Sequence, residues 1–342
     1  MSHRLDLKQG RVEMAHGGGG RAMAQLIREL FLPFMENPAL RAGNDGALLA
    51  RPEGRLVVST DCHVITPLFF PGGDIGSLSV HGTLNDVAMM GGYPIALTAG
   101  FVLEEGFPLA DLARIARSMG EAACAAGVPI VTGDTKVVER GKGDGIYINT
   151  TGIGVVAEGV ELGGERARPG DHLLLSGTLG DHGIAILAQR ENLTFASDIR
   201  SDSAALHGLV ATMLDAAPGL RCLRDPTRGG LAATLNEITA QAGVGVLIRE
   251  AAIPLRAPVK AVCELLGLDP LNIANEGKLL AVCPPGESAR LLDAMCAHPL
   301  GRDAALIGEF IADEHHFVQM ETSFGSRRTV DWLAGEQLPR IC

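Results

Sequence analysis

The sequence is poor in aromatic residues and lacks paired cysteine motifs. Phe, Trp and Tyr make up 4% of the 342 residues, whereas hydrophobic residues together reach 46% and glycine contributes 44 residues. The seven cysteines are scattered and form no Cys-x-x-Cys pair, which argues against a structural zinc site or a disulfide framework. We therefore expect a Gly- and Ala-rich α/β protein with reduced thiols, typical of the cytoplasm.

The sequence also lacks basic runs and long apolar runs. Its formal net charge is −11 and no cluster of Lys or Arg offsets it, so nucleic acid is not expected as a partner. No segment is long and apolar enough to span a bilayer, and the N-terminal residues contain no signal-peptide core. These absences predict a cytoplasmic protein that does not bind a membrane.

The pattern of apolar segments predicts strands that alternate with helices. Buried strands are expected at residues 55–61 and 128–132, a β-like run at 146–156, a helix through Asn85 and Asp86, and an Ala-rich helix at 109–126. The charged, Gly- and Pro-containing segment 163–171 reads as a linker. We predict an α/β (α+β) fold with an N-terminal domain at 1–164, a C-terminal domain at 165–332 and a flexible tail at 333–342.

Five aspartates occupy predicted turns, strand ends or helix segments: Asp45, Asp61, Asp86, Asp134 and Asp225. One such residue is usually a helix cap or a turn residue. Several carboxylates at one rim of a sheet would repel each other unless a cation neutralised them, and Mg²⁺ bridging to a polyphosphate is the natural candidate. No G-x-x-x-x-G-K-[ST] sequence occurs, so an ATP site here would not be a P-loop.

Two short segments extend this hypothesis. Residues 17–20 are four glycines before a predicted helix, and they form either a flexible cap or a place where main-chain N–H groups approach a phosphate. The chain ends on Cys342, whose neighbouring carboxylate opposes thiolate formation, so the sulfur would need help from a pocket. A frayed terminus is the structural alternative, but the sequence offers no other obvious nucleophile.

Together these motifs resemble the HypE family of hydrogenase-maturation proteins, within the PurM-like (AIR synthase-related) ATP-binding superfamily. The resemblance covers essentially the whole chain, through residues 16–20, 60–64, 71–76, 85–86, 131–138, 181–183, 224–231, 274–278 and 339–342. The acidic motifs are shared across the superfamily, whereas the terminal Pro-Arg-Ile-Cys is specific to HypE. Segment 198–206 departs from the family pattern because it is more polar, which concerns the detail of one loop.

The resemblance implies an ATP- and Mg²⁺-dependent carbamoyl dehydratase that acts on its own C-terminal cysteine. A carbamoyltransferase resembling HypF would load the Cys342 sulfur, and the protein would dehydrate the carbamoyl group to a thiocyanate. The cyano group would pass to the iron of a [NiFe] hydrogenase precursor on a HypC–HypD-type scaffold complex. The superfamily implies two PurM-like domains and a homodimer in which the N-terminal halves pair and the ATP site borders the interface.

The expected chemistry assigns roles to named residues. ATP would phosphorylate the amide oxygen to make it a leaving group, and a base would remove the amide protons. The expected catalytic residues are Cys342, Glu276 as the base and Lys136. The expected nucleotide-binding residues are Gly18, Gly19, Asn85, Asp134, Thr135 and Arg228. The expected metal ligands are Asp45, Asp61, Asp86 and Asp225.

Structural alternatives stand beside these roles. Glu276 could be a solvated loop carboxylate, and His63 and His81 are as readily structural hydrogen-bonders as catalysts. Two rival functions are another superfamily kinase or synthetase, which would act on a free molecule, and a non-enzymatic carrier that only presents Cys342. ATP consumption that depends on carbamoylation of Cys342 separates all three.

Overall fold

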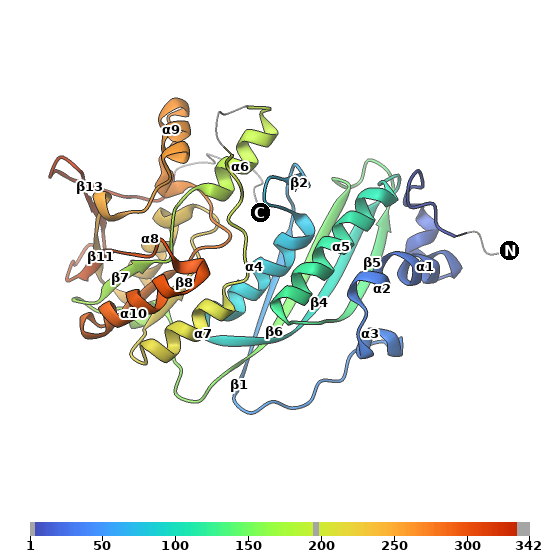
Figure 1. The fold of residues 1–342 in the computed structure, drawn as a ribbon, viewed down its shortest axis with the longest axis horizontal. Helices are drawn as coiled ribbons and strands as arrows, with labels where there is room; N and C mark the ends of the chain where they lie inside the picture. The colour runs from blue at the N-terminus through green and yellow to red at the C-terminus, as the bar shows by residue number, and fades with distance from the viewer. Residues whose placement is uncertain (1–3, 194–197, 334–342) are drawn as a thin grey trace.

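The structure is a computed structural model that describes residues 4–193 and 198–333 (Figure 1). Strands of one sheet come from residues 55–156 and strands of a second, larger sheet from residues 172–329, and the two sheets lie in separate halves of an elongated molecule. The mixed helix-and-sheet fold agrees with the expected class. The domain boundary near residue 165 falls between the two sheets and stays a prediction.

The first sheet has the strand order β1-β6-β4-β5, in which only β4 and β5 are parallel neighbours. Its strands are β1 (Arg55–His63), β4 (Gly92–Glu104), β5 (Ile130–Val138) and β6 (Ile146–Val156). Helices α4 (Ile75–Met89) and α5 (Leu109–Ala126) cover one face (Figure 1). On the other face Leu56 and Val58 are each more than half exposed, so the described residues of a single chain leave that face uncovered there.

Three sequence expectations for this half need correction. Strand β1 forms, but it is an edge strand with one exposed face rather than a buried strand. The strand expected at 128–132 does not end there, because β5 continues to Val138. The 13-residue strand β4, in the middle of the sheet, was not expected at all, because its Gly, Pro and Thr residues interrupt the apolar pattern.

The segment before β1 wraps the β5 side of this half. It contains a 3₁₀ turn (Met14–Gly17), α1 (Arg21–Leu26), one π-helical turn (Ile27–Phe31), α2 (Leu32–Met35) and α3 (Pro38–Ala42). A small hairpin of β2 (Phe69–Phe70) and β3 (Gly73–Asp74) leads into α4. Asp74 caps α4, since its carboxylate accepts hydrogen bonds from the N–H groups of Gly76 and Ser77.

The second sheet has the order β13-β12-β9-β11-β7-β10-β8. Its strands are β7 (His172–Leu175), β8 (Cys222–Arg224), β9 (Gly245–Arg249), β10 (Leu280–Cys283), β11 (Ala305–Ile311), β12 (Val318–Glu321) and β13 (Arg327–Thr329). The helices are α6 (Asp181–Arg190), α7 (His207–Ala216), α8 (Gly230–Ala242), α9 (Ala257–Leu266) and α10 (Pro285–Ala297). Short 3₁₀ turns lie at Gly164–Arg166, Glu250–Ala252, Pro270–Asn272 and Pro299–Gly301.

The leucine side chains of β7 alternate between the two faces of this sheet, and each face packs against helices. Leu173 and Leu175 pack in the core that contains α8, whereas Leu174 packs in the core that contains α7 and α10. The core that contains α7 and α10 also contains Ala88 and Met89 at the end of α4. The C-terminal end of α4 is therefore packed into the second half, and the seam between the halves lies along this helix.

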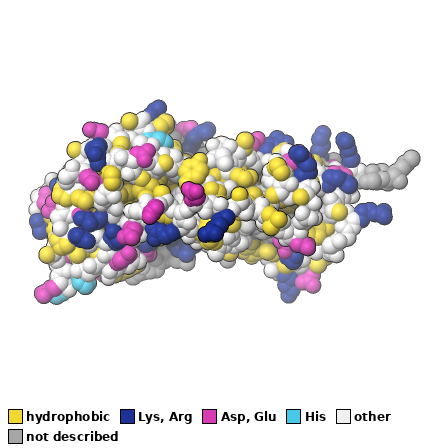
Figure 2. Space-filling view, turned by 90° about the horizontal axis from the view of Figure 1, so that it is seen from below, with side chains coloured by type: hydrophobic (Ala, Val, Ile, Leu, Met, Phe, Trp, Pro, Cys, Tyr) yellow, Lys and Arg dark blue, Asp and Glu magenta, His cyan; other side chains and the backbone are white. Residues whose placement is uncertain are grey.

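No helix in the described ranges is both long and apolar enough to cross a membrane. On the face shown in Figure 2, Lys and Arg side chains lie interspersed with Asp and Glu side chains among the described residues.

Candidate active site

Four carboxylates gather at the seam between the halves. Asp61 lies on β1 and Asp86 on α4, while Asp225 follows β8 and Glu276 precedes β10. A Cβ atom built on Gly82 of α4 would lie 3.8 Å from Asp61 Oδ2 and 4.0 Å from Glu276 Oε2. Carboxylate oxygens from the two halves thus face the same point, and three of the four predicted metal ligands belong to this group.

Burial and mutual repulsion make this cluster electrostatically unfavourable when it is empty. Burial, followed by the charge of Asp225, raises the pKa of Glu276 well above its ordinary value. Asp225 is partly accessible as a residue, yet burial and the charge of Asp86 raise the pKa of its carboxyl to about 7. Burial also raises the pKa of Asp86, and a 2.8 Å hydrogen bond from Ser59 Oγ opposes that shift. A bound cation would relieve this repulsion.

The donor set fits Mg²⁺ in kind, since all four groups offer hard oxygen ligands. Among the described residues, no three His, Cys, Asp or Glu side chains converge closely enough to hold a metal by themselves. Mg²⁺ commonly takes one or two carboxylates and completes its octahedron with phosphate oxygens and water. Glu276 Oε1 is buried without a hydrogen-bond partner in the structure, so this site has an unused oxygen.

Asp45 does not join the cluster. It lies in an exposed bend between α3 and β1, whereas Asp61 and Asp86 are held against each other by the packing of α4 on β1. The turn residues around Asp45 explain its place, because Asn-Asp-Gly favours an exposed turn. Its assignment as a metal ligand stays a prediction that this arrangement does not support.

Lys136 lies on the opposite face of the first sheet from Glu276. Its Nζ is 2.6 Å from Asp134 Oδ2, and both side chains are at least 60% exposed. This ion pair is the first cause of the lowered pKa of Asp134. A pocket of about 340 Å³ is lined by Lys136, Asp134 and Cys62, all on the uncovered face. Because side chains alternate along a strand, Asp61 beside Cys62 points the other way, toward α4.

The glycine run begins against strand β5. A Cβ atom on Gly17 would come 2.7 Å from the main-chain N of Val137, so this residue packs tightly against β5. Gly19 adopts φ +74°, and a Cβ atom built there would meet nothing within 4 Å. Gly18 is similarly open, with its nearest contact at 3.7 Å. The loop therefore packs on β5 at Gly17 and is open at Gly18 and Gly19. A loop whose main-chain N–H groups bind a phosphate needs this kind of open glycine.

The other predicted nucleotide residues have different surroundings. The buried Asn85 donates both amide hydrogens to main-chain oxygens and accepts one main-chain N–H, so the structure gives it partners within the protein. Thr135 is buried and its N–H donates to Asp134 Oδ1. Arg228 is exposed just before α8.

Of the two histidines, His63 is buried and His81 is half-buried, and both contact polar side chains. His63 Nε2 lies 3.6 Å from Asp61 Oδ2, and burial lowers the pKa of His63 although the aspartate opposes this. Burial lowers the pKa of His81 to about 4, and its Nδ1 lies 3.0 Å from Ser203 Oγ. Both imidazoles are therefore neutral near pH 7, which favours the structural reading.

Comparisons with known proteins identify the family. Family models described as AIR synthase related protein match residues 43–156 (N-terminal domain) and 168–321 (C-terminal domain). The carbamoyl dehydratase HypE of Azotobacter vinelandii is 66% identical over 339 residues, which cover 99% of each chain. The chain belongs to the HypE family of carbamoyl dehydratases.

Solved structures of HypE proteins have the same fold. A HypE in complex with ATP matches at a TM-score of 0.93 with 48% identity, covering 96% of this chain and 99% of that one. A HypE–HypF complex matches at 0.80 with 47% identity, covering 90% and 99%. The two-domain fold, the family and the hydrogenase-maturation dehydratase class predicted from the sequence are confirmed.

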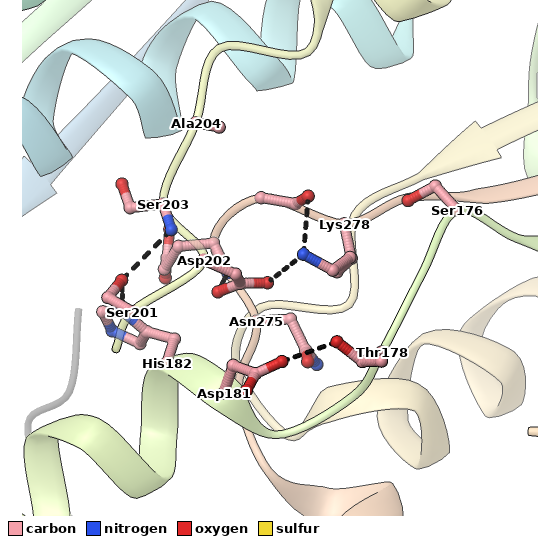
Figure 3. A network of polar contacts seen from close by, with 12 residues as sticks. Ser176, Thr178, Asp181, His182, Ser201, Asp202, Ser203, Ala204, Asn275 and Lys278 are labelled. Carbon is pink, nitrogen blue, oxygen red and sulfur yellow. Dashed lines mark hydrogen bonds and ion pairs between the residues drawn. The ribbon is translucent and has the colours of Figure 1, made fainter. Parts of the chain in front are cut away.

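The structure adds residues to this HypE site that sequence reasoning missed. Asp202 accepts a 3.1 Å hydrogen bond from the N–H of Glu276 and pairs with Lys278 (Figure 3). The polar composition of segment 198–206 is the sequence signal that points to this loop. Cys342, the expected nucleophile, and residues 334–341 of the expected tail lie outside the described part of the chain.

Proposed function

We propose that this HypE-family protein uses ATP to dehydrate a carbamoyl group carried on Cys342 to a thiocyanate, in the synthesis of the cyanide ligand for [NiFe] hydrogenase. The observation that carries the proposal is the position of Glu276. Its carboxylate is buried beside three aspartates, and its Oε1 has no hydrogen-bond partner among the residues that the structure describes. A buried, unpartnered carboxylate at the seam of an ATP-binding family fold is suited to take a proton from a bound substrate.

The reaction needs two proton transfers and one phosphoryl transfer. The carbamoyl oxygen attacks the γ-phosphorus of ATP, ADP leaves, and the first N–H proton is lost to a base. Loss of the second N–H proton with departure of phosphate leaves the C≡N group on sulfur. Glu276 is proposed as the base, and exclusion of water at the buried seam protects the phosphorylated intermediate from hydrolysis.

Phosphate and metal roles follow from the charges. Asp61, Asp86 and Asp225 would hold Mg²⁺ against the ATP phosphates, where it would offset the charge of the transferring phosphoryl group. The relative solved with ATP supports nucleotide binding in this fold. Gly18, Gly19, Asp134, Thr135 and Arg228 are proposed to contact the nucleotide, as the sequence predicts.

A homodimer is proposed because two expected catalytic residues, Lys136 and Glu276, lie on opposite faces of the first sheet in a single chain. Lys136 lies on the uncovered face of the first sheet, whereas Glu276 lies on the α4 side. The same uncovered face carries the exposed apolar side chains Leu56 and Val58. Pairing of two copies through this face would bury them and would place Lys136 at the boundary between the copies.

Two protein partners are proposed. The solved HypE–HypF complex of a relative supports a carbamoyltransferase of the HypF type as the enzyme that loads Cys342. A HypC–HypD-type scaffold that carries iron would accept the cyano group, and the cytoplasm is the expected location of this sequence of reactions.

The test uses the intact chain with a HypF-type carbamoyltransferase, carbamoyl phosphate and Mg-ATP. Mass spectrometry of the C-terminal peptide should show thiocyanate in the wild type and accumulated carbamoyl in Glu276→Gln. Glu264→Gln is the matched control, since Glu264 is an exposed carboxylate on α9. ADP release without Cys342 carbamoylation would instead indicate a kinase or synthetase, and carbamoylation without ADP release would indicate a carrier.

A further inference from the structure

Two hydrogen bonds hold the main chain of Glu276, whereas the side-chain oxygen Oε1 has no partner among the described residues. The N–H of Glu276 donates to Asp202 Oδ1 at 3.1 Å, and its carbonyl oxygen accepts from Asn85 Nδ2 at 3.1 Å. Glu276 Oε1, by contrast, is buried and has no hydrogen-bond partner within residues 4–193 and 198–333. Such an arrangement restricts the backbone and keeps the carboxylate available for a ligand.

Asp202 is in turn held by a buried ion pair (Figure 3). Its Oδ2 lies 3.1 Å from Lys278 Nζ, and the two side chains are 5% and 14% exposed. Lys278 Nζ also donates to the carbonyl oxygen of Gly277. A buried charge without its counter-ion is strongly destabilising, so the two side chains depend on each other.

The loop that carries Asp202 packs directly on the loop that carries Glu276. A Cβ atom on Gly277 would lie 1.8 Å from the carbonyl oxygen of Asp202, so only glycine permits this approach. The flanking serines tie the loop to both halves of the molecule. Ser203 Oγ lies 3.0 Å from His81 Nδ1 on α4, and Ser201 Oγ lies 2.8 Å from His182 Nδ1 on α6 (Figure 3).

We propose that Asp202 is a positioning residue for the dehydration step, with Lys278 as its counter-ion. Asp202 fixes the main chain of Glu276 so that the carboxylate points at the reacting group. The proposal rests on the proposed function of Glu276. A merely structural ion pair would contribute to stability without governing the rate of the step that Glu276 performs.

Two double variants separate the hydrogen bond from the charges. Asp202→Asn with Lys278→Met removes both charges but keeps an oxygen that accepts from the Glu276 N–H. Asp202→Ala with Lys278→Met removes that acceptor as well. We expect the first variant to keep kcat for carbamoyl-dependent ATP turnover within about 3-fold, and the second to lose about 10- to 100-fold with KM for ATP unchanged.

Asp171→Asn is the matched control, because Asp171 forms a similarly buried ion pair with Arg221 at 2.7 Å, and this pair lies outside the loop contacts that hold Glu276. This variant should lower Tm without lowering kcat. If the Ala-containing double variant does not fold, Asp202→Ser with Lys278→Met replaces it, since the shorter hydroxyl side chain does not span the same gap. Equal kcat values in the Asn and Ala double variants would overturn the proposal.

A second readout does not depend on turnover. Hydrogen exchange of the Glu276 amide should stay slow in the Asn double variant and become faster in the Ala double variant. Equally slow exchange in both would overturn the positioning role. If the wild type shows no carbamoyl-dependent ATP turnover while the exchange difference is present, the proposed function fails and the hold of Asp202 on Glu276 stands.

Discussion

Asn85 and Glu276 belong to different halves of the chain, and Nδ2 of the first donates to the carbonyl oxygen of the second over 3.1 Å. The same amide nitrogen donates to the carbonyl oxygen of Ala204, and Asn85 Oδ1 accepts from the N–H of Leu206 at 2.8 Å. One buried side chain on α4 therefore joins the first half to two loops of the second. Geometry at the candidate base depends on how the halves pack.

Replacing Asn85 with Ala should destabilise the protein and slow the reaction. The change leaves three buried main-chain groups without partners, and we expect a loss of about 2–3 kcal/mol in the free energy of unfolding. Urea denaturation measures this loss. Asn236→Ala is the control, because Asn236 also donates two hydrogen bonds to main-chain oxygens but entirely within the second half. Loss of stability in both variants with loss of kcat only in Asn85→Ala is the expected pattern; normal kcat in Asn85→Ala would contradict it.

Part of this fold was predictable because its signals are local. The amphipathic helix 109–126 and the strand 146–156 were expected at the bounds that the structure has. Periodicity of apolar residues and a following glycine define the helix from sequence alone, and Gly127 does adopt the left-handed conformation at its end. The gathering of Asp61, Asp86 and Asp225 was also anticipated, since the resemblance placed all three in one acidic site.

The rest depends on contacts between distant segments. Strand β4 contains Pro94 and two glycines, so its central place in the sheet follows from pairing with β5 and β6 rather than from propensity. The face on which Lys136 lies is set by strand register, which the local sequence does not reveal. Asp202 approaches Glu276 across more than seventy residues of chain, and only packing of the two loops brings them together.

The stability of the protein should fall as pH rises, because the crowded carboxylates of this site bind protons more tightly in the folded state. The pKa of Asp225 is raised from 3.8 to about 7, so the folded protein binds this proton more tightly than the unfolded chain does. The resulting stabilisation is present below the unfolded value near 4 and is lost as pH rises through about 7. Asp86 and Glu276 shift in the same direction.

In metal-free protein, Tm should therefore fall between about pH 5 and about pH 8, and Mg²⁺ should restore more stability at the higher pH. Differential scanning calorimetry with and without Mg²⁺ measures both effects. Asp225→Asn should reduce the fall in Tm and the response to Mg²⁺. An equal response to Mg²⁺ at the two pH values would count against a metal site at these carboxylates.

The roles of Asp86 and Asp45 can be separated by one substitution each. Asp86→Asn should weaken Mg-ATP binding at least about tenfold, because it removes a charged oxygen from the cluster. The fold should persist, since the 2.8 Å hydrogen bond from Ser59 Oγ can still be made to the amide oxygen. Asp45→Asn should change affinity little, given its exposed bend. Calorimetric titration with Mg-ATP decides the matter, and the reverse ranking of the two variants would show that Asp45 is the ligand.

A charge on the uncovered sheet face should dissociate the proposed homodimer. Val58 is 62% exposed on β1, and Val58→Lys would place an ammonium group in an apolar interface without a partner. Sedimentation at micromolar concentration should show a dimer for the wild type and a monomer for the variant. Leu265→Lys is the control, because Leu265 is an exposed apolar residue on α9 of the other half. A monomeric wild type would refute the assembly.

The last prediction concerns which thiol carries the carbamoyl group. Cys342 is the expected carrier, but Cys62 is an exposed thiol in the same pocket as Lys136, where Asn149 Nδ2 donates to its sulfur at 3.1 Å. Cys342→Ser should abolish carbamoyl-dependent ADP release and leave the affinity for Mg-ATP unchanged, because the carboxylates proposed to hold Mg²⁺ are Asp61, Asp86 and Asp225. Cys62→Ser should retain both activities, since a hydroxyl also accepts from Asn149. Peptide mapping after carbamoylation identifies the modified sulfur directly, and modification of Cys62 in the Cys342→Ser variant with normal ADP release would move the reaction to β1.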